Sequence, residues 1–279
     1  MADPSPKKPV VFTDLDGTLL DHDTYSWRAA APALGACRAR HVPVVMVSSK
    51  TRAEMEPLGS ELGIEAPFAV ENGGAVYLPR KEFPEPPEGG REDGPWWRIE
   101  PGSPYREIVP ALEEISGKLG VRLEGFAGMS VDRIMEVTGL DREGARLAAA
   151  REYDEPFVAP RTGMEAMLAK AAASRGLRVS GGGRFFHLHG DNDKGRAVRL
   201  VVEAYGKRGL EVVSAGLGDS HNDESMLKVV DHPYFVGPPE RTPRDIPRLV
   251  VTKRTGPEGW NLAVLDFLSW CAGRGRGTP

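Results

Sequence analysis

The chain has 279 residues, 40% of them hydrophobic and 27% charged, with a formal net charge of −4 at pH 7, which is the balance of an ordinary globular protein. The negative net charge argues against a general nucleic-acid binder, and no apolar run reaches the roughly 18 residues of a membrane helix. Cys37 and Cys271 show no metal-type spacing, so we expect a cytoplasmic protein that has no disulfide and binds neither nucleic acid nor a membrane.

The first predicted element is a buried strand over residues 10–13, where β-branched and aromatic side chains follow one another. It leads directly into Asp14, Leu15 and Asp16. Residues two apart in an extended chain point the same way, so the two aspartates share one face, and Gly17 permits a sharp turn after them. Two carboxylates this close repel each other unless a cation or a shared proton holds them. Taken alone, the pair is also typical of a strand that ends in an acidic turn.

Helices and strands then alternate. We expect a helix over 26–40, a strand over 42–48, a helix over 51–62 and strands over 68–70 and 75–78. Thr51 and Glu54 have the spacing of a capping box, and Gly63 is a typical helix stop. The alternation predicts an α/β fold, a doubly wound and mostly parallel sheet.

The composition changes near residue 79. The stretch from there to residue 101 is rich in proline, glycine and charged residues, which is typical of a linker or a long exposed loop. Beyond it we expect helices over 103–119 with Ser103 as N-cap, 130–138, 141–150 and 162–176, and strands over 121–126, 178–180 and 184–189. The mixture predicts an inserted α+β cap domain over residues 82–190, in a core domain made of residues 1–81 and 191–279.

After the insert we expect a helix over 194–205 and a strand over 212–217. Two short strands, over 235–237 and 249–251, and a helix over 258–270 complete the core.

Polar residues follow three of the predicted strands at the point where each strand ends. Ligands bind at the carboxyl edge of open α/β sheets, so these side chains would meet there. The candidates are Asp14 and Asp16 after the first strand, Ser48 and Ser49 after the second, and Asp219, Asn222 and Asp223 after the strand that follows the insert. Lys194 begins a helix that leads into the same sheet.

The residue types in this group predict a chemistry. Carboxylates from two strand ends, without cysteine, suit Mg²⁺ better than zinc. A lysine, a serine hydroxyl and helix N-termini suit a phosphoryl group. Together they favour phosphoryl transfer in which an aspartate attacks phosphorus. Taken alone, Ser48 and Ser49 are more typical of plain turn and cap residues.

The order and spacing of DLDGT at 14–18, Ser48, Lys194 and GDSHND at 218–223 resemble the four motifs of the haloacid dehalogenase superfamily. The resemblance implies a phosphatase whose nucleophile, Asp14, becomes an aspartyl-phosphate. Asp16 would be the general acid for the leaving alcohol and then the base for water. Ser48, Ser49 and Lys194 would hold the phosphoryl oxygens.

The same resemblance implies a magnesium site. Its ligands would be the side chains of Asp14 and Asp219 and the backbone carbonyl of Asp16, while Asn222 and Asp223 would order the loop around them. The long insert resembles the larger α/β cap of sugar-phosphate phosphatases.

Five segments resemble the mannosyl-3-phosphoglycerate phosphatases more closely: VSSKTRAEM at 47–55, ENGGAVY at 71–77, REYDEPF at 151–157, GGRFFHLHG at 182–190 and GDSHNDESML at 218–227. Members of that family free the compatible solute mannosylglycerate from its phosphorylated precursor. The resemblance implies a phosphorylated sugar-glycerate as substrate. Related sugar phosphates (glucosyl-3-phosphoglycerate, sucrose or trehalose phosphate), a phosphomutase and a non-catalytic sugar-phosphate sensor remain open, as does the oligomeric state, with a homodimer among the possibilities.

Substrate recognition would fall to residues of the insert and its hinge. A guanidinium fork suits the substrate carboxylate, and amide or carboxylate groups suit sugar hydroxyls. The candidates are Arg151, Glu152 and Arg184 in the insert and Asn72 and Gly73 at the hinge. Surface ion pairing is the alternative for the charged residues among them. His187 and His189 share one face of a strand, where a substrate contact and a structural role are both open. The hinge is expected near residues 77–80 and 189–194.

Overall fold

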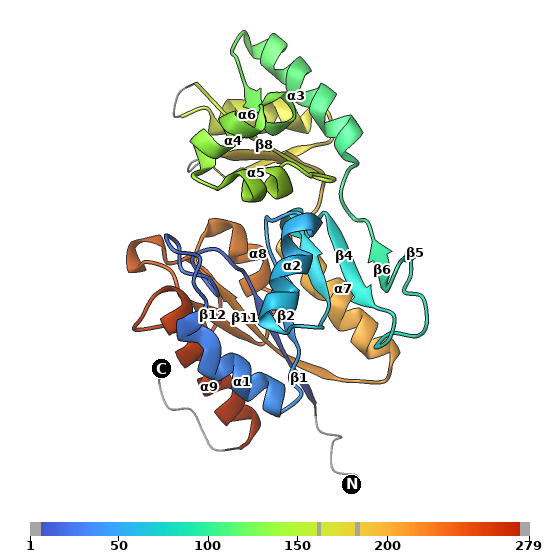
Figure 1. Cartoon of the computed structure of the whole chain (residues 1–279), viewed down its shortest axis with the longest axis vertical. Coiled ribbons are helices and arrows are strands. Elements are labelled where there is room, and N and C mark those ends of the chain that lie inside the picture. Colours follow the sequence, from blue (N-terminus) through green and yellow to red (C-terminus); the bar gives the residue numbers. More distant parts are fainter. Residues whose placement is uncertain (1–6, 161–162, 182–184, 274–279) are drawn as a thin grey trace.

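The computed structural model describes residues 7–160, 163–181 and 185–273, and they form two separate β-sheets (Figure 1). The larger one, the core sheet, runs in the spatial order β13 (Val250–Val251), β12 (His232–Phe235), β11 (Val212–Gly218), β1 (Lys8–Thr13), β2 (Val44–Val47), β3 (Phe68–Val70), β4 (Ala75–Pro79), β6 (Trp96–Ile99) and β5 (Arg91–Asp93). The smaller one, the cap sheet, runs in the order β7 (Glu124–Gly125), β8 (Asp154–Val158), β10 (Phe186–His189) and β9 (Arg178–Gly181).

The core sheet is parallel from β13 to β3 and antiparallel from β3 to β5. The predicted doubly wound, mostly parallel sheet is thereby confirmed. Thr13 of β1 pairs with both Met46 of β2 and Leu217 of β11, so these three strands end at the same level. The residues that follow them therefore meet at one edge.

Both faces of the core sheet are covered. One face packs against α1 (Ala31–Ala39), α2 (Arg52–Leu62) and α9 (Gly256–Cys271), and the other against α7 (Lys194–Lys207) and the short α8 (Glu224–Leu227). Val11 and Met46 face the first group, and Val10 and Val45 face the second. Burial on both faces is why the central strands are continuous apolar runs and not alternating ones. None of the helices in the described ranges has the length and apolar character of a membrane span.

The capping box at the start of α2 is confirmed. The Thr51 hydroxyl accepts a hydrogen bond from the Glu54 backbone N–H, the Glu54 carboxylate accepts one from the Thr51 N–H, and Gly63 ends the helix with a positive φ of 64°. The first helix of the core begins later than expected. A short 3₁₀ turn, η1 (Arg28–Ala30), precedes α1.

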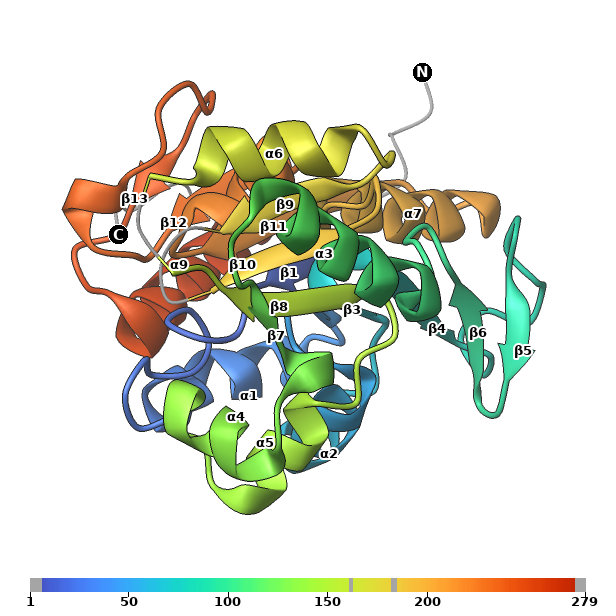
Figure 2. The ribbon, with the colours of Figure 1, turned by 90° about the horizontal axis from the view of Figure 1, so that it is seen from above.

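The cap sheet has helices on one face. α3 (Tyr105–Leu119) and α6 (Glu165–Ala173) cover it through an apolar cluster that includes Phe157, Phe186 and Leu188. α4 (Val131–Thr138), which is capped by the Ser130 side chain, and α5 (Arg142–Ala148), which is capped by that of Asp141, form a second small cluster. The opposite face of the sheet lies over the carboxyl edge of the core sheet, as the side and top views both show (Figure 2).

The prediction of a linker or long exposed loop over 79–101 is wrong for residues 91–99, which form two strands. β6 pairs with β4, and β5 pairs with β6, so the chain adds a hairpin to the core sheet. Trp96 packs edge-on against Phe68 with 5.0 Å between ring centroids, and such contacts outweigh the turn-forming composition. The chain leaves the core sheet only after Ile99. We therefore propose a cap over residues 103–189, shorter than the expected 82–190.

Other differences lie in the cap. Ser103 does not cap α3, because the helix begins at Tyr105 after Pro104 without a side-chain cap. Strand β8 was not predicted, and the strand expected over 121–126 is reduced to β7, followed by a 3₁₀ turn, η3 (Phe126–Gly128). The helix expected from residue 162 begins at Glu165, and Thr162 lies outside the described residues.

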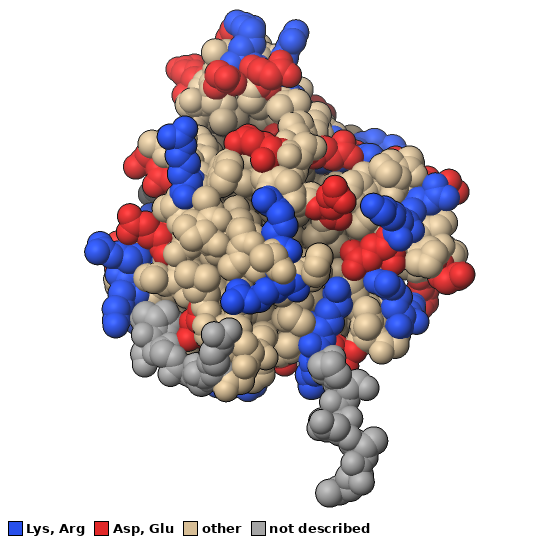
Figure 3. Space-filling view, turned by 60° about the horizontal axis from the view of Figure 1, so that its bottom comes forward, with Lys and Arg blue, Asp and Glu red and all other residues tan. Residues whose placement is uncertain are grey.

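Acidic and basic side chains are mixed on the face drawn in Figure 3, over the described residues at the bottom of the core. No single sign of charge dominates that view.

Candidate active site

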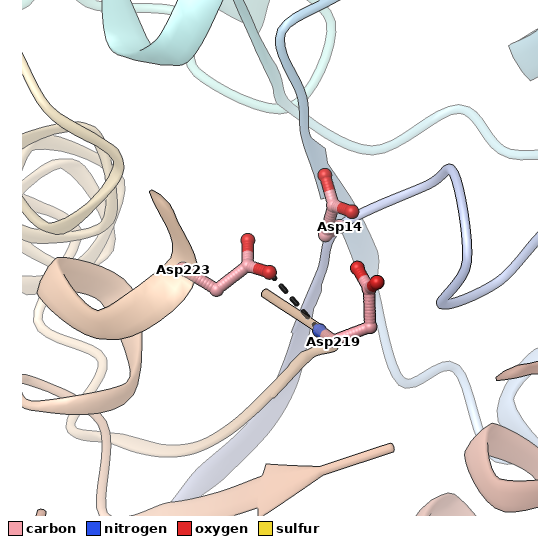
Figure 4. Close-up of side chains that lie close together, drawn as sticks. All are labelled: Asp14, Asp219 and Asp223. Atoms are coloured by element: carbon pink, nitrogen blue, oxygen red, sulfur yellow. Dashed lines mark hydrogen bonds between the residues drawn. The ribbon is translucent and has the colours of Figure 1, made fainter. Parts of the chain in front are cut away.

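Three buried carboxylates converge at the carboxyl edge of the core sheet (Figure 4). Asp14 follows β1, Asp219 follows β11, and Asp223 lies in the 3₁₀ turn η4 (His221–Asp223) that comes next. One oxygen from each lies within 4.8 Å of the others. Gly17 makes room for this arrangement, because a Cβ there would lie 2.7 Å from Oδ2 of Asp219. Its φ of +75° also suits glycine.

Lys194 enters the cluster from the first residue of α7. Its Nζ lies 2.6 Å from Oδ1 of Asp14 and 2.7 Å from Oδ1 of Asp223, and the side chain is fully buried. Gly195 lets α7 come close to α8, since a Cβ there would meet the backbone oxygen of Ser225 at 2.3 Å. The helix packing therefore delivers the ammonium group to the two carboxylates.

The carboxylates differ in how many of their oxygens are engaged. Asp223 uses both, because Oδ1 accepts from Lys194 and Oδ2 accepts from the backbone N–H groups of Asp219 and Ser220. Among the described residues, Asp14 Oδ2 and Asp219 Oδ1 each have one hydrogen-bond donor, the Thr18 hydroxyl, at 3.5 and 3.2 Å. Asp14 and Asp219 therefore have oxygens available for a cation, whereas Asp223 orders the loop and the lysine.

The negative charge of the site exceeds its positive charge. Burial, reinforced by the neighbouring carboxylates, raises the pKa of Asp14 well above its usual value and that of Asp219 to about 6, although Lys194 acts in the opposite direction. One ammonium group does not balance three buried carboxylates, and a divalent cation would. The ligand atoms are all oxygen, which fits Mg²⁺. The predicted ligands Asp14 and Asp219 are thus brought together, and the contribution of the Asp16 carbonyl stays a prediction.

The carboxylate of Asp16 forms an ion pair with Lys50, a residue to which the sequence alone assigned no role. Nζ of Lys50 lies 2.9 Å from Oδ2 of Asp16 and 3.7 Å from Oε1 of Glu54, and it lies over the ring of Tyr25. Burial alone would lower the pKa of Lys50, but Asp16 and Glu54 raise it. Oδ1 of Asp16 is buried and has no hydrogen-bond partner in the described part of the chain. The position of Lys50 directly after two serines at a strand end was the signal that could have identified it.

Ser48 and Ser49 lie beside this pair, directly after β2. Ser48 is buried, and its Oγ accepts a hydrogen bond from the Lys50 N–H at 3.2 Å. Its hydroxyl proton remains available for a phosphoryl oxygen. The backbone oxygen of Ser49 accepts from Arg151 of the cap at 2.8 Å. Phosphate binding by these two serines stays a prediction.

The expected hinge residues Asn72 and Gly73 lie in a strained turn, η2 (Glu71–Gly73). Glu71, Asn72 and Gly73 have φ values of 49°, 56° and 85°, and a Cβ on Gly73 would lie 2.4 Å from the backbone oxygen of Asp193. Consecutive left-handed residues are costly unless their surroundings hold them, and they gather at functional sites. The Asn72 amide contacts both domains, donating to Asp154 of the cap and accepting from Asn222 of the core.

The cap returns to the core at residues 151–154. Both oxygens of the fully buried Glu71 accept from backbone N–H groups of this segment, those of Glu152 and Tyr153. Arg151 is buried too, so the alternative of a surface ion pair is wrong for it. The Glu152 side chain is 40% exposed and lies 3.6 Å from Arg98. Arg184 lies outside the described residues.

This arrangement has the parts that phosphoryl transfer needs. A carboxylate at a strand end can act as the nucleophile, a lysine and a metal site can offset the charge of a phosphoryl group, and a second carboxylate two residues on can exchange a proton.

Comparisons with known proteins agree with the geometry. Residues 11–83 match a family described as haloacid dehalogenase-like hydrolase. A Methanococcoides burtonii protein named glucosyl-3-phosphoglycerate/mannosyl-3-phosphoglycerate phosphatase is 41% identical over 267 residues, covering 94% of this chain and 97% of the relative. A mannosyl-3-phosphoglycerate phosphatase of Pyrococcus furiosus is 38% identical over 231 residues, covering 82% and 90%.

Solved structures share the fold. A Thermoplasma acidophilum protein superposes with a TM-score of 0.66 at 21% identity, covering 94% of this chain and 99% of its own. A Bacteroides thetaiotaomicron phosphatase of the haloalkanoate (HAD) enzyme superfamily gives 0.66 at 14% identity, with 97% and 98% covered.

Proposed function

Since the chain belongs to the mannosyl-3-phosphoglycerate phosphatase family of the haloacid dehalogenase superfamily, and is therefore a phosphatase, we propose that it hydrolyses mannosyl-3-phosphoglycerate to mannosylglycerate and phosphate. The observation that carries the proposal is the convergence of Asp14, Asp219 and Lys194 at one sheet edge, beneath the cap. The relative from Methanococcoides burtonii is named for both sugars, which favours the glucosyl compound as a second substrate.

The first half of the reaction transfers the phosphoryl group to the protein. A carboxylate oxygen of Asp14 forms a bond to phosphorus, and the bond between phosphorus and the glycerate oxygen breaks. Asp16 gives that oxygen its proton, so an alcohol leaves. Lys194 and the Ser48 hydroxyl hold the phosphoryl oxygens as charge develops on them.

The second half returns the protein to its starting state. Asp16, now ionised, takes a proton from a water molecule as that water attacks phosphorus. The bond between phosphorus and Asp14 breaks, and inorganic phosphate leaves. The unpartnered Oδ1 of Asp16 is the oxygen that we assign to the proton, because Lys50 engages Oδ2.

We propose Mg²⁺ as the cofactor, held by Asp14 and Asp219 with the Asp16 carbonyl. When bound, it offsets the repulsion between the carboxylates and the phosphoryl group and polarises the phosphoryl oxygens. The raised pKa values of Asp14 and Asp219 support this proposal, because they show that the ionised carboxylates lack a compensating positive charge that a bound cation would supply.

The test is phosphate release from a panel of substrates in the presence of Mg²⁺. The panel contains mannosyl-3-phosphoglycerate, glucosyl-3-phosphoglycerate, sucrose phosphate, trehalose phosphate and p-nitrophenyl phosphate. We expect the highest kcat/KM for the two phosphoglycerates that carry a sugar. A preference for sucrose or trehalose phosphate would overturn the substrate, and phosphate transfer between substrate positions without release would indicate a phosphomutase.

A further inference from the structure

His187 lies on the face of the cap sheet that is turned toward the core, and one of its ring nitrogens, Nε2, has no hydrogen-bond partner among the described residues. Phe186 and Leu188 of β10 are buried against α3 and α6, so His187 between them points to the opposite face. That face lies over the carboxyl edge of the core sheet (Figures 1 and 2). The His187 side chain is 20% exposed there, which leaves it accessible to a ligand.

Asp154 fixes the orientation of this imidazole. Nδ1 of His187 lies 2.8 Å from Oδ1 and 3.1 Å from Oδ2 of Asp154. Burial would raise the pKa of Asp154, but His187 and Arg151 hold it well below its usual range. When the ring is neutral and its Nδ1–H donates to this carboxylate, the lone pair lies on Nε2. Nε2 has no hydrogen-bond partner within 7–160, 163–181 and 185–273.

The His187–Asp154 pair is connected to the loop beside the metal site. Oδ2 of Asp154 accepts from the Asn72 amide at 3.2 Å, and Oδ1 of Asn72 accepts from the Asn222 amide at 3.4 Å. Strand β9, the neighbour of β10, contacts η4, which contains Asn222. The imidazole is therefore held over the catalytic edge by a chain of side chains that reaches into the core.

The other histidine on this face is not available for a ligand. Nδ1 of His189 lies 2.9 Å from the backbone oxygen of Gly190, and Nε2 lies 3.0 Å from Oγ of Ser180. The side chain is also buried. His189 is therefore a structural histidine, and His187 is the one that is free to meet a substrate.

We propose that Nε2 of His187 accepts a hydrogen bond from a hydroxyl group of the sugar in the substrate. The inference rests on the proposed function, because a phosphoryl group at Asp14 leaves the rest of the substrate on the side of the cap. A lone pair on Nε2 selects a hydroxyl group over a carboxylate, since an ionised carboxylate has no proton to donate. His187 thus determines specificity for the sugar and not for the glycerate.

The test compares His187→Asn with His187→Gln. Asparagine keeps a donor near the Nδ1 position for Asp154 and removes the atom at Nε2, whereas glutamine places a polar atom near Nε2. We measure kcat/KM for mannosyl-3-phosphoglycerate divided by kcat/KM for p-nitrophenyl phosphate, which lacks a sugar. We expect this ratio to fall about tenfold in His187→Asn and less in His187→Gln, as for the loss of one hydrogen bond. His189→Asn, with the same change on the same face, is expected to keep the wild-type ratio.

Several outcomes decide the matter. An unchanged ratio in His187→Asn overturns the inference, and so does an equal loss on both substrates. A rise in the inhibition constant of 3-phosphoglycerate for His187→Asn, by the same factor as the ratio falls, also overturns it. That compound has the carboxylate but no sugar, so His187 would then bind the glycerate part. If melting curves show that His187→Asn does not fold, His187→Ala replaces it, and a wild-type ratio of the two kcat/KM values in His187→Ala overturns the inference. A wild-type protein that cleaves p-nitrophenyl phosphate but no sugar-phosphoglycerate refutes the proposed function itself, and this inference with it.

Discussion

The guanidinium of Arg151 in the cap donates a hydrogen bond from Nη1 to the backbone oxygen of Ser49 in the core, at 2.8 Å. The same guanidinium lies 3.4 Å from Oδ1 of Asp154 and 4.0 Å from Oε2 of Glu71. Because Ser49 directly follows Ser48, this arginine fixes the position of the cap on the predicted phosphate-binding loop. A buried cation between two buried carboxylates costs stability if it is removed alone.

Arg151→Ala is therefore expected to lower the free energy of unfolding by about 3–5 kcal/mol, because Glu71 and Asp154 lose their buried cation. Urea denaturation measures the change. Arg142→Ala is the matched control, since Arg142 forms an exposed ion pair with Asp132 and should cost no more than about 1 kcal/mol. Equal losses in the two variants would contradict the buried network.

The same variant tests substrate binding by Arg151. We expect Arg151→Ala to weaken the binding of mannosyl-3-phosphoglycerate more than it affects the hydrolysis of p-nitrophenyl phosphate, because only the former is large enough to reach the cap, which Arg151 holds on the core. Steady-state kinetics on both substrates measure the effect. An equal loss on both would show that Arg151 is structural.

Asp14→Asn is expected to lower kcat by at least about 10³-fold, because the amide cannot attack phosphorus. The fold should persist. Burial raises the pKa of Asp14 and so disfavours its charge, which means that a neutral amide is tolerated in the absence of a cation. The checks are phosphate release and the melting temperature in EDTA. Activity close to wild type would refute Asp14 as the nucleophile, whereas a large fall in melting temperature would make the variant uninformative about chemistry and call for Asp14→Ser.

The topology of the core sheet explains why the acidic cluster could be predicted from the sequence. Asp14 and Asp219 follow short, mainly apolar runs of the kind that form buried parallel strands, and parallel strands end at one edge. Lys194 could be placed because a helix that follows an insert returns to the same sheet. In these cases, local pattern and global topology point to the same answer.

Strand β8 could not be predicted, for an equally physical reason. It begins with Asp154, Glu155 and Pro156, which are untypical of a central strand. The two carboxylates are satisfied by partners that are far away in the chain, Asn72 and His187 for Asp154 and Tyr105 for Glu155. Only the tertiary fold brings these partners together. The position of Lys50 after two serines was visible in the sequence, but its pairing with Asp16 depends on the tertiary fold.

Lys50→Met is expected to lower kcat for mannosyl-3-phosphoglycerate by about 10–100-fold with little change in KM, as Asp16 loses the partner that orients it. The effect should be smaller on p-nitrophenyl phosphate, whose leaving group needs little protonation. Lys50→Arg, which retains the charge, should recover part of the rate. Equal losses on the two substrates would indicate that Lys50 acts through something other than proton transfer to the leaving group.

Magnesium should stabilise the protein more at about pH 7.5 than at about pH 5.5. In the folded protein without metal, burial raises the pKa of Asp219 to about 6, above its unfolded value near 3.9. The stability from this group is present below pH 4 and is lost as the pH rises through 6, where the carboxylate becomes free to bind a cation. Melting temperatures in EDTA and in Mg²⁺ across this range check the prediction. A magnesium-induced shift that is the same at both pH values, or that survives in Asp219→Asn, would contradict it.

Glu71 should make the attachment of the cap sensitive to pH. Burial, with a contribution from Asp154, raises its pKa to about 7 against the lowering effect of Arg151, whereas the unfolded value is near 4.3. A raised carboxyl pKa means that the stability is present below about pH 4.3 and is lost as the pH rises through 7, so this group favours the folded state less at higher pH. The difference in free energy of unfolding between the wild type and Glu71→Gln should therefore fall by about 3 kcal/mol from pH 4 to pH 8.

Urea denaturation of both proteins at each pH gives that difference, and the subtraction removes titrations that they share, such as that of Asp219. Glu61→Gln is the matched control, because Glu61 on α2 accepts a bond from the Trp27 indole at the surface, and its difference from the wild type should stay nearly constant. Hydrogen exchange at the backbone amides of Glu152 and Tyr153, which donate to Glu71, should report the same change locally. A difference that is flat between pH 4 and pH 8 would mean that Glu71 stays ionised and that Arg151 alone compensates for its burial.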